Sequence, residues 1–148
     1  MIVGIIGSQG IGSLSTNLQL VFSNNLVSVA KIAEARSDAI AQNRDLYRLL
    51  AASIAGSDAA ERSAIVASMN ENRQTSERAF AVYRATPLAD DERAAGDRME
   101  KDWPAYQAII ERVAATIERG DLAAAKQLMA GEMHQAYRTV MDEMEIMV

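Results

Sequence analysis

The feature that most constrains the fold is a helical apolar periodicity that continues from about residue 20 to the C-terminus. Apolar residues recur at spacings of three and four, and no stretch of six or more residues alternates cleanly between apolar and polar, as a half-buried strand would. Only three short breaks interrupt the pattern, around Gly56, Pro87 and Gly120. The sequence therefore predicts four helices and an all-α fold.

Each predicted helix carries its own apolar repeat. The first contains Leu26, Val29, Ala33, Ile40, Tyr47, Leu50 and Ile54. The second contains Ile65, Met69, Phe80 and Tyr83. The third contains Met99, Trp103, Tyr106, Ile110, Val113 and Ile117, which step by 4, 3, 4, 3 and 4 as in a heptad seam. The fourth contains Leu122, Ala125, Met129, Met133, Tyr137, Val140, Met144 and Met147.

The breaks between the helices have the chemistry of helix ends. Gly56 and Gly120 tolerate the positive φ of a helix C-terminus, and Asp58 with Glu61 three residues later forms a capping-box pattern. Pro87 disfavours the helical conformation at the residue before it. Inside the third helix, Pro104 removes one backbone hydrogen bond, so we expect either a bend there or a break into two helices.

Helices of similar length joined by short connections must run antiparallel to their neighbours. We therefore expect an up-down-up-down four-helix bundle over residues 21–148, with the first helix extended at its N-terminal end. In such a bundle both chain ends lie at the same end. The geometry suits an extracytoplasmic domain held between two transmembrane helices that lie outside this chain.

The N-terminal segment is unusual because the first charged residue is Lys31. The apolar run from Met1 to Gly7 is much shorter than the ~20 residues that a spanning helix needs. We interpret residues 1–20 as the end of a transmembrane helix and a stalk. The alternative is a frayed N-terminal helix with a few apolar residues.

Composition excludes several classes of function. The chain has no Cys and a single His, which excludes thiolate zinc sites, cysteine nucleophiles and imidazole metal clusters. Fifteen basic against twenty acidic residues give a net charge of −5, the wrong sign for nucleic-acid binding. We expect no enzyme activity, no metal and no cofactor. A b-type haem held by His134 with Met129 or Met133 remains an alternative.

Two arginines one helical turn apart are the strongest candidates for ligand binding. Arg44 and Arg48 repel each other on an open helix, but a carboxylate bridging them would match both guanidinium forks. Asn43 and Tyr47 stand beside them. The apolar repeat of the first helix passes next to the pair, so we expect at least one arginine to face another helix. The alternative is a solvated pair offset by Asp45.

Counting residues from the turns shows what lies level with this pair in a bundle. Five further polar or aromatic residues fall within one slab with Arg44 and Tyr47. They are Arg73, Tyr106, Gln107, His134 and Tyr137. Of these, we expect Arg73, Tyr106 and Tyr137 to line a ligand site, although both tyrosines also lie on core repeats, where ring burial is common.

Four stretches resemble the periplasmic four-helix sensor domain of methyl-accepting chemotaxis proteins. They are Val21–Val29 where the stalk enters the bundle, Asn43–Arg48 on the first helix, Thr86–Glu92 between the second and third helices, and Gly120–Met129 at the start of the fourth. The order and spacing of these stretches carry the resemblance. Ser28 replaces a proline that is often present in the family.

This resemblance implies a homodimeric receptor of the bacterial inner membrane with this domain in the periplasm. In the aspartate-sensing members, arginines on the first helix hold the carboxylates of the ligand, and the spacing of Arg44 and Arg48 matches two of them. A third arginine falls on Ala39, and the polar contacts of the fourth helix fall on 125–130, where only Lys126 and Gln127 are polar. The resemblance thus implies a small organic acid, such as a di- or tricarboxylate or an amino acid.

Two other classes of function are compatible with the same bundle. The bundle is also compatible with the sensor domain of a histidine kinase. Only sequence beyond Val148 would distinguish such a kinase from a chemotaxis transducer. The other class is a non-sensing helical adaptor. Whether the ligand pocket lies within one bundle or between two subunits is left open by the sequence.

Overall fold

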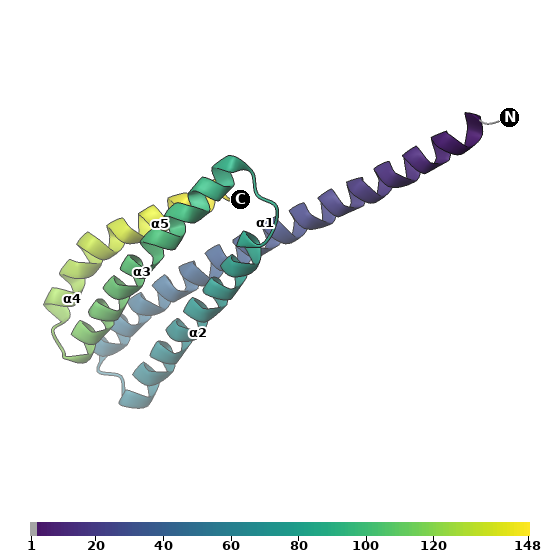
Figure 1. The fold of residues 1–148 in the computed structure, drawn as a ribbon. Coiled ribbons are helices and arrows are strands. Elements are labelled where there is room, and N and C mark those ends of the chain that lie inside the picture. The colour runs from purple at the N-terminus through teal and green to yellow at the C-terminus, as the bar shows by residue number, and fades with distance from the viewer. Residues whose placement is uncertain (1–2) are drawn as a thin grey trace.

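The computed structural model describes the backbone of residues 3–148 and the side chains of residues 25–148. Three long helices come first, α1 (Val3–Ala55), α2 (Ala59–Arg84) and α3 (Asp90–Glu118). The fourth helix consists of α4 (Leu122–Leu128), a π-helical turn η1 (Met129–Met133) and α5 (His134–Ile146). Figure 1 shows the antiparallel bundle, with the C-terminus at the end from which α1 extends. The predicted all-α four-helix bundle is confirmed.

The helix ends follow the predicted chemistry. Gly56 and Gly120 have φ values of 73° and 81°, which residues with a side chain rarely adopt. The Oδ1 atom of Asp58 accepts a hydrogen bond of 2.8 Å from the backbone N–H of Glu61 at the start of α2. α3 continues through Pro104, so the alternative of two helices there is wrong.

The segment predicted to be a membrane-helix end and stalk, residues 1–20, lies in the part whose side chains are not described. Among the helices that are described, none combines the length and apolarity required to cross a membrane.

The predicted core faces of α2, α3 and the fourth helix are largely confirmed. Most of the predicted residues are buried, while Phe80, Trp103, Leu122 and Tyr137 are half-buried against the core. Methionine is unusually frequent in this core. The buried methionines are Met69, Met99, Met129, Met133, Met141, Met144 and Met147. Because methionine is flexible and polarizable, such a core tolerates small shifts between helices.

The predicted core face of α1 is wrong. Leu26, Ile40, Tyr47 and Ile54 are 69%, 44%, 47% and 54% exposed. The face that packs on the core instead consists of Ile32, Ala35, Ala39, Leu46, Leu49 and Ala52. This inner face has small alanines and also buries Gln42 and Asp45, so its pattern is less apolar than that of the exposed face. We call the exposed heptad repeat Leu26, Ala33, Ile40, Tyr47 and Ile54 the outer seam.

The π-helical turn in the fourth helix accommodates one additional residue. The core repeat passes through Ala125, Met129, Met133 and Tyr137 in three successive steps of four, whereas a heptad repeat alternates three and four. In a regular α-helix the additional residue would rotate the downstream face away from the core. The wider turn absorbs it, and Met129 and Met133 remain only 3% and 1% exposed.

Deleting Gly131, which lies in η1 and contacts no neighbouring helix, is expected to convert the turn to regular α-helix and to preserve the core. The thermal unfolding midpoint should remain unchanged or rise, because glycine disfavours helix. Deleting the exposed Arg138 instead rotates Val140 and Met144 out of the core and should lower the midpoint by roughly 10 °C or more. Equal losses from the two deletions would contradict this account of η1.

Candidate ligand-binding site

The two predicted arginines are arranged around a buried carboxylate of their own helix. The side chain of Asp45 is 0% exposed, and its Oδ1 atom accepts a hydrogen bond of 2.7 Å from Nη1 of Arg48. On the α2 side, Ser68 Oγ and Asn72 Nδ2 donate to Oδ2 of Asp45 at 2.6 Å and 3.0 Å. Asp45 therefore joins α1 to α2 and partly neutralises the arginine pair, as the alternative interpretation of the sequence predicted.

Arg44 is held much less tightly than Arg48. Its Nε atom lies 3.9 Å from Oδ1 of Asp45, too far for a hydrogen bond. Among the residues whose side chains are described, no other carboxylate forms an ion pair with Arg44. The side chains of Arg44 and Arg48 are 67% and 56% exposed, so the expectation that one of them is buried against another helix of the chain is wrong.

Arg44 stands at the edge of the outer seam. It lies one turn from Ile40 and one turn from Tyr47, and both of these residues are exposed. The carbonyl oxygen of the Asn43 side chain is buried without a hydrogen-bond partner. An available guanidinium thus stands beside an exposed apolar stripe and an amide group with an unused acceptor.

Three predicted tyrosines lie near one another where α1, α3 and α5 meet. The rings of Tyr106 and Tyr137 are 6.2 Å apart between centroids. Burial raises the pKa of the Tyr106 phenol, and the neighbouring Tyr137 and Tyr47 raise it further. The Tyr106 hydroxyl has no hydrogen-bond partner although the residue is fully buried. An unpaired buried hydroxyl of this kind is energetically costly.

Arg73 lies elsewhere, between α2 and α3. Its Nε and Nη1 atoms contact Glu77 and Glu111 at 2.9 Å and 2.8 Å. The hydrogen bond to Glu77 raises the pKa of Arg73, and the one to Glu111 adds to this effect. Arg73 also lines a cavity of about 210 Å³ with Gln42 and Gln107. None of the described contacts joins Arg73 to Arg44 or Arg48.

The structure therefore brings together only some residues of the predicted slab. Gln107 pairs with Gln42 across the core, each amide donating to the other at 2.7 Å and 2.9 Å. Sequence reasoning missed Gln42 and the central position of Asp45, because both interrupt the apolar pattern of the inner face. His134 is exposed while Met129 and Met133 are buried, so these three side chains do not converge as a Met–His haem site requires.

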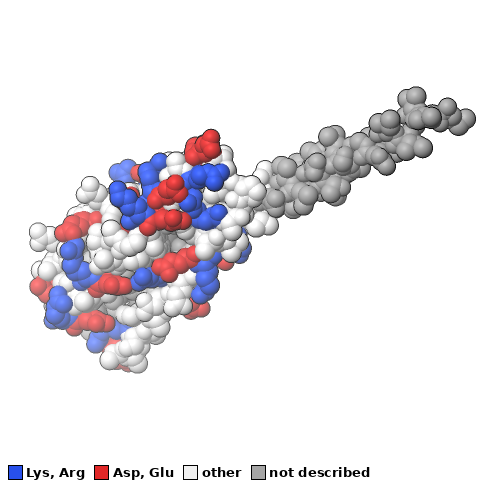
Figure 2. Space-filling model, viewed as in Figure 1, with Lys and Arg blue, Asp and Glu red and all other residues white. Residues whose placement is uncertain are grey.

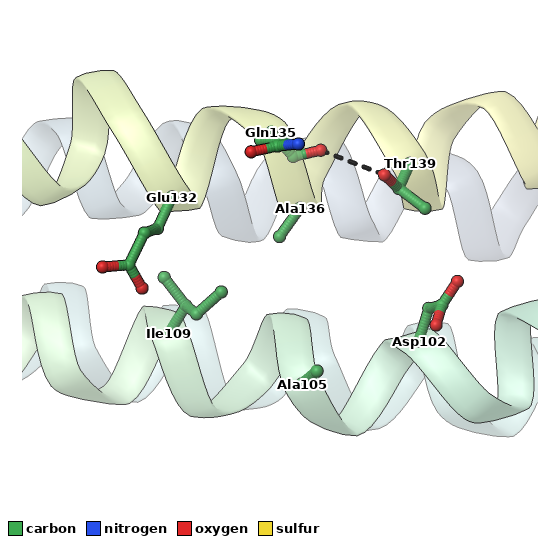
Figure 3. A pocket seen from close by; sticks show the side chains of 7 residues that line it. All are labelled: Asp102, Ala105, Ile109, Glu132, Gln135, Ala136 and Thr139. Atoms are coloured by element: carbon green, nitrogen blue, oxygen red, sulfur yellow. Dashed lines mark hydrogen bonds between the residues drawn. The ribbon is translucent and has the colours of Figure 1, made fainter.

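The groove between α3 and the fourth helix is larger than the cavity beside Arg73, but it is less suited to an acidic ligand. It has a volume of about 350 Å³, and Ile109 and Ala136 face each other across it (Figure 3). Asp102 and Glu132 are its charged residues, and no basic residue lines it. Glu132 is already paired with Arg112, and the carboxylate of Asp102 disfavours an anion in the same groove.

The face of the bundle drawn in Figure 2 shows no concentration of one charge. In Figure 2, Lys and Arg alternate with Asp and Glu over the visible face of the bundle. In the described part of the chain, no three His, Cys, Asp or Glu residues are grouped as a metal ion requires. The arginine pair beside the outer seam is the arrangement best suited to a carboxylate.

Replacing Asp45 with Asn should lower the free energy of unfolding by about 2 kcal/mol, because charge-assisted hydrogen bonds from two helices are lost. Urea unfolding followed by circular dichroism measures this effect. The matched control is Asp142→Asn, since Asp142 is exposed and should contribute little. Equal unfolding midpoints for the two variants would contradict the central structural position of Asp45.

Comparison with known families agrees with this architecture. A family model described as a four helix bundle sensory module for signal transduction matches residues 1–148. Comparisons with curated proteins and with solved structures give no match.

Proposed function

We propose that this chain, which belongs to the four-helix-bundle sensory modules of methyl-accepting chemotaxis proteins, senses a small organic acid at Arg44, Arg48 and Tyr47. The observation that supports this most directly is the exposed guanidinium of Arg44. Among residues 25–148 no carboxylate forms a hydrogen bond with it, and it lies beside an exposed apolar stripe.

Asp45 occupies Arg48 but leaves the guanidinium of Arg44 available to a carboxylate ligand. Its Oδ1 atom accepts a hydrogen bond from Arg48 while lying 3.9 Å from Arg44, so one carboxylate already sits close to both guanidinium groups. A ligand carboxylate would take the unused donors of Arg44 on the solvent side. A second carboxylate would reach Arg48, which explains why a di- or tricarboxylate or an acidic amino acid suits the pair.

The outer seam supports a homodimer. Its five residues repeat every seven positions, the spacing of a left-handed helix pair. Leu26, Ile40, Tyr47 and Ile54 are all more than 40% exposed within one chain. A second copy placed on this face would cover them.

Such a dimer would place the ligand between two subunits. Tyr47 would form one wall of the site, and Tyr137 and the unpaired hydroxyl of Tyr106 would lie behind it. Asn43 would supply an amide group. Arg73 would act indirectly, since its ion pairs with Glu77 and Glu111 stabilise the opposite side of the bundle.

The fourth helix would carry the signal toward the membrane. Its core face is rich in methionine and contains the π-helical turn η1 close to Tyr137. Movement of the additional residue along the helix would displace α5 by about 1.5 Å, the rise of one residue. Ligand binding would favour one of the two packings.

We further propose that this domain is periplasmic and that transmembrane helices outside this chain attach it to the bacterial inner membrane. The positions of the two helices that would connect to the membrane support this, because α1 enters the bundle and α5 ends at the same end of it (Figure 1). A receptor with this arrangement passes movement of either helix directly to the membrane.

Replacing Ile40 with Asp should convert the dimer to monomer, because a charge would be buried on the outer seam. Sedimentation velocity measures the change. The control is Val82→Asp, since Val82 is 45% exposed on α2 and Ile40 is 44% exposed on α1. Dissociation by both variants, or by neither, would remove the outer seam as the interface.

Replacing Arg44 with Ala should weaken binding of the preferred acid about tenfold or more, the effect of losing a charged hydrogen bond. Succinate, malate, citrate and aspartate are screened first by thermal shift, and binding is then measured by calorimetry. Arg119→Ala, which removes an exposed arginine near the α3–α4 turn, is the control. Unchanged affinity in the Arg44 variant would eliminate this residue from the site.

A further inference from the structure

A small cavity between α2 and α3 has a chemistry that the carboxylate site does not share. Its volume is about 160 Å³, and α2 supplies Ser76, Glu77 and Phe80 to its wall. α3 supplies Met99, Glu100, Trp103 and Pro104. Phe80 and Trp103 are only half-buried. The cavity arises because α2 packs mainly on α1 and α3 mainly on α5, rather than on each other.

Two ion-pair bridges between α2 and α3 limit the cavity along the groove. At one end, the Nε atom of Arg84 lies 2.9 Å from Oε1 of Glu100, and Arg84 also pairs with Asp97. Gly96 permits this bridge, because an added Cβ atom would collide with the Arg84 side chain. At the other end, Arg73 joins Glu77 to Glu111. The cavity therefore lies between two ion-pair bridges that join the same two helices.

The charges around this cavity favour a cation. The two bridges contain four carboxylates and two guanidinium groups, which leaves an excess of two negative charges. None of the seven lining residues is basic. The indole Nε1–H of Trp103 already donates to Oε1 of Glu77 at 2.9 Å, so it is not available to an anion.

We propose that this cavity binds a small alkylammonium ion. The rings of Trp103 and Phe80 can attract a cation through their faces. Glu77 and Glu100 are each paired with an arginine, so the opposite charge comes from the net excess of two negative charges on the two bridges together. Liquid water occupies about 30 Å³ per molecule, so a volume of about 160 Å³ admits a compact group such as trimethylammonium. The site is independent of Arg44 and lies on a different pair of helices.

The chain offers a direct optical test because Trp103 is its only tryptophan. The full chain is titrated with tetramethylammonium chloride while sodium chloride is reduced to hold ionic strength constant. We expect a saturable change in tryptophan emission. Neutral tert-butanol, of similar shape, should give no saturable change, and an equal response to tert-butanol would overturn the cationic character of the site.

Variants separate this cavity from other sites. Phe80→Leu keeps an apolar side chain but removes one ring face, and it should weaken binding about threefold or more. Glu100→Gln should weaken it similarly, while Glu132→Gln, which removes a glutamate paired with Arg112 outside the cavity, should leave it unchanged. Thermal unfolding of each variant verifies the fold. No saturable response in the native chain, or equal affinity in all three variants, would overturn the proposal.

Discussion

The bundle depends on α1 presenting two different faces. The inner face is rich in alanine, which lets α2 approach closely, and it buries Asp45 only because Ser68, Asn72 and Arg48 satisfy that carboxylate. The outer seam is more apolar and remains exposed within one chain. Within one chain, α1 thus organises the core with one face and leaves the other face exposed.

The proposed carboxylate site follows from this division. Asp45 stands between the inner face and the arginines, so the groups that bind ligand are connected by hydrogen bonds to α2. Tyr47 belongs to the outer seam and lies near enough to Tyr106 of α3 to raise the pKa of that phenol. Binding at one place would therefore act on the dimer contact and on the core at the same time.

The sequence predicted the helices, their ends and most of the core, because capping residues and heptad spacing act locally. It predicted the wrong face of α1, because an exposed apolar stripe on a helix has the same periodicity as a buried core face. The π-helical turn in the fourth helix was not predicted, although the repeat takes three successive steps of four from Ala125 to Tyr137. At the proposed site, the sequence indicated Arg44 and Arg48 as candidates, whereas the buried position of Asp45 depends on where α2 packs.

The most direct test of the two-faced α1 is cysteine cross-linking, since the native chain has no Cys. Ile40→Cys places a single thiol on the outer seam, and Val82→Cys places one on α2 with similar exposure. Under mild oxidation, the account predicts a covalent dimer from the first variant, formed in dilute solution, and little from the second. Equal or reversed cross-linking would contradict it.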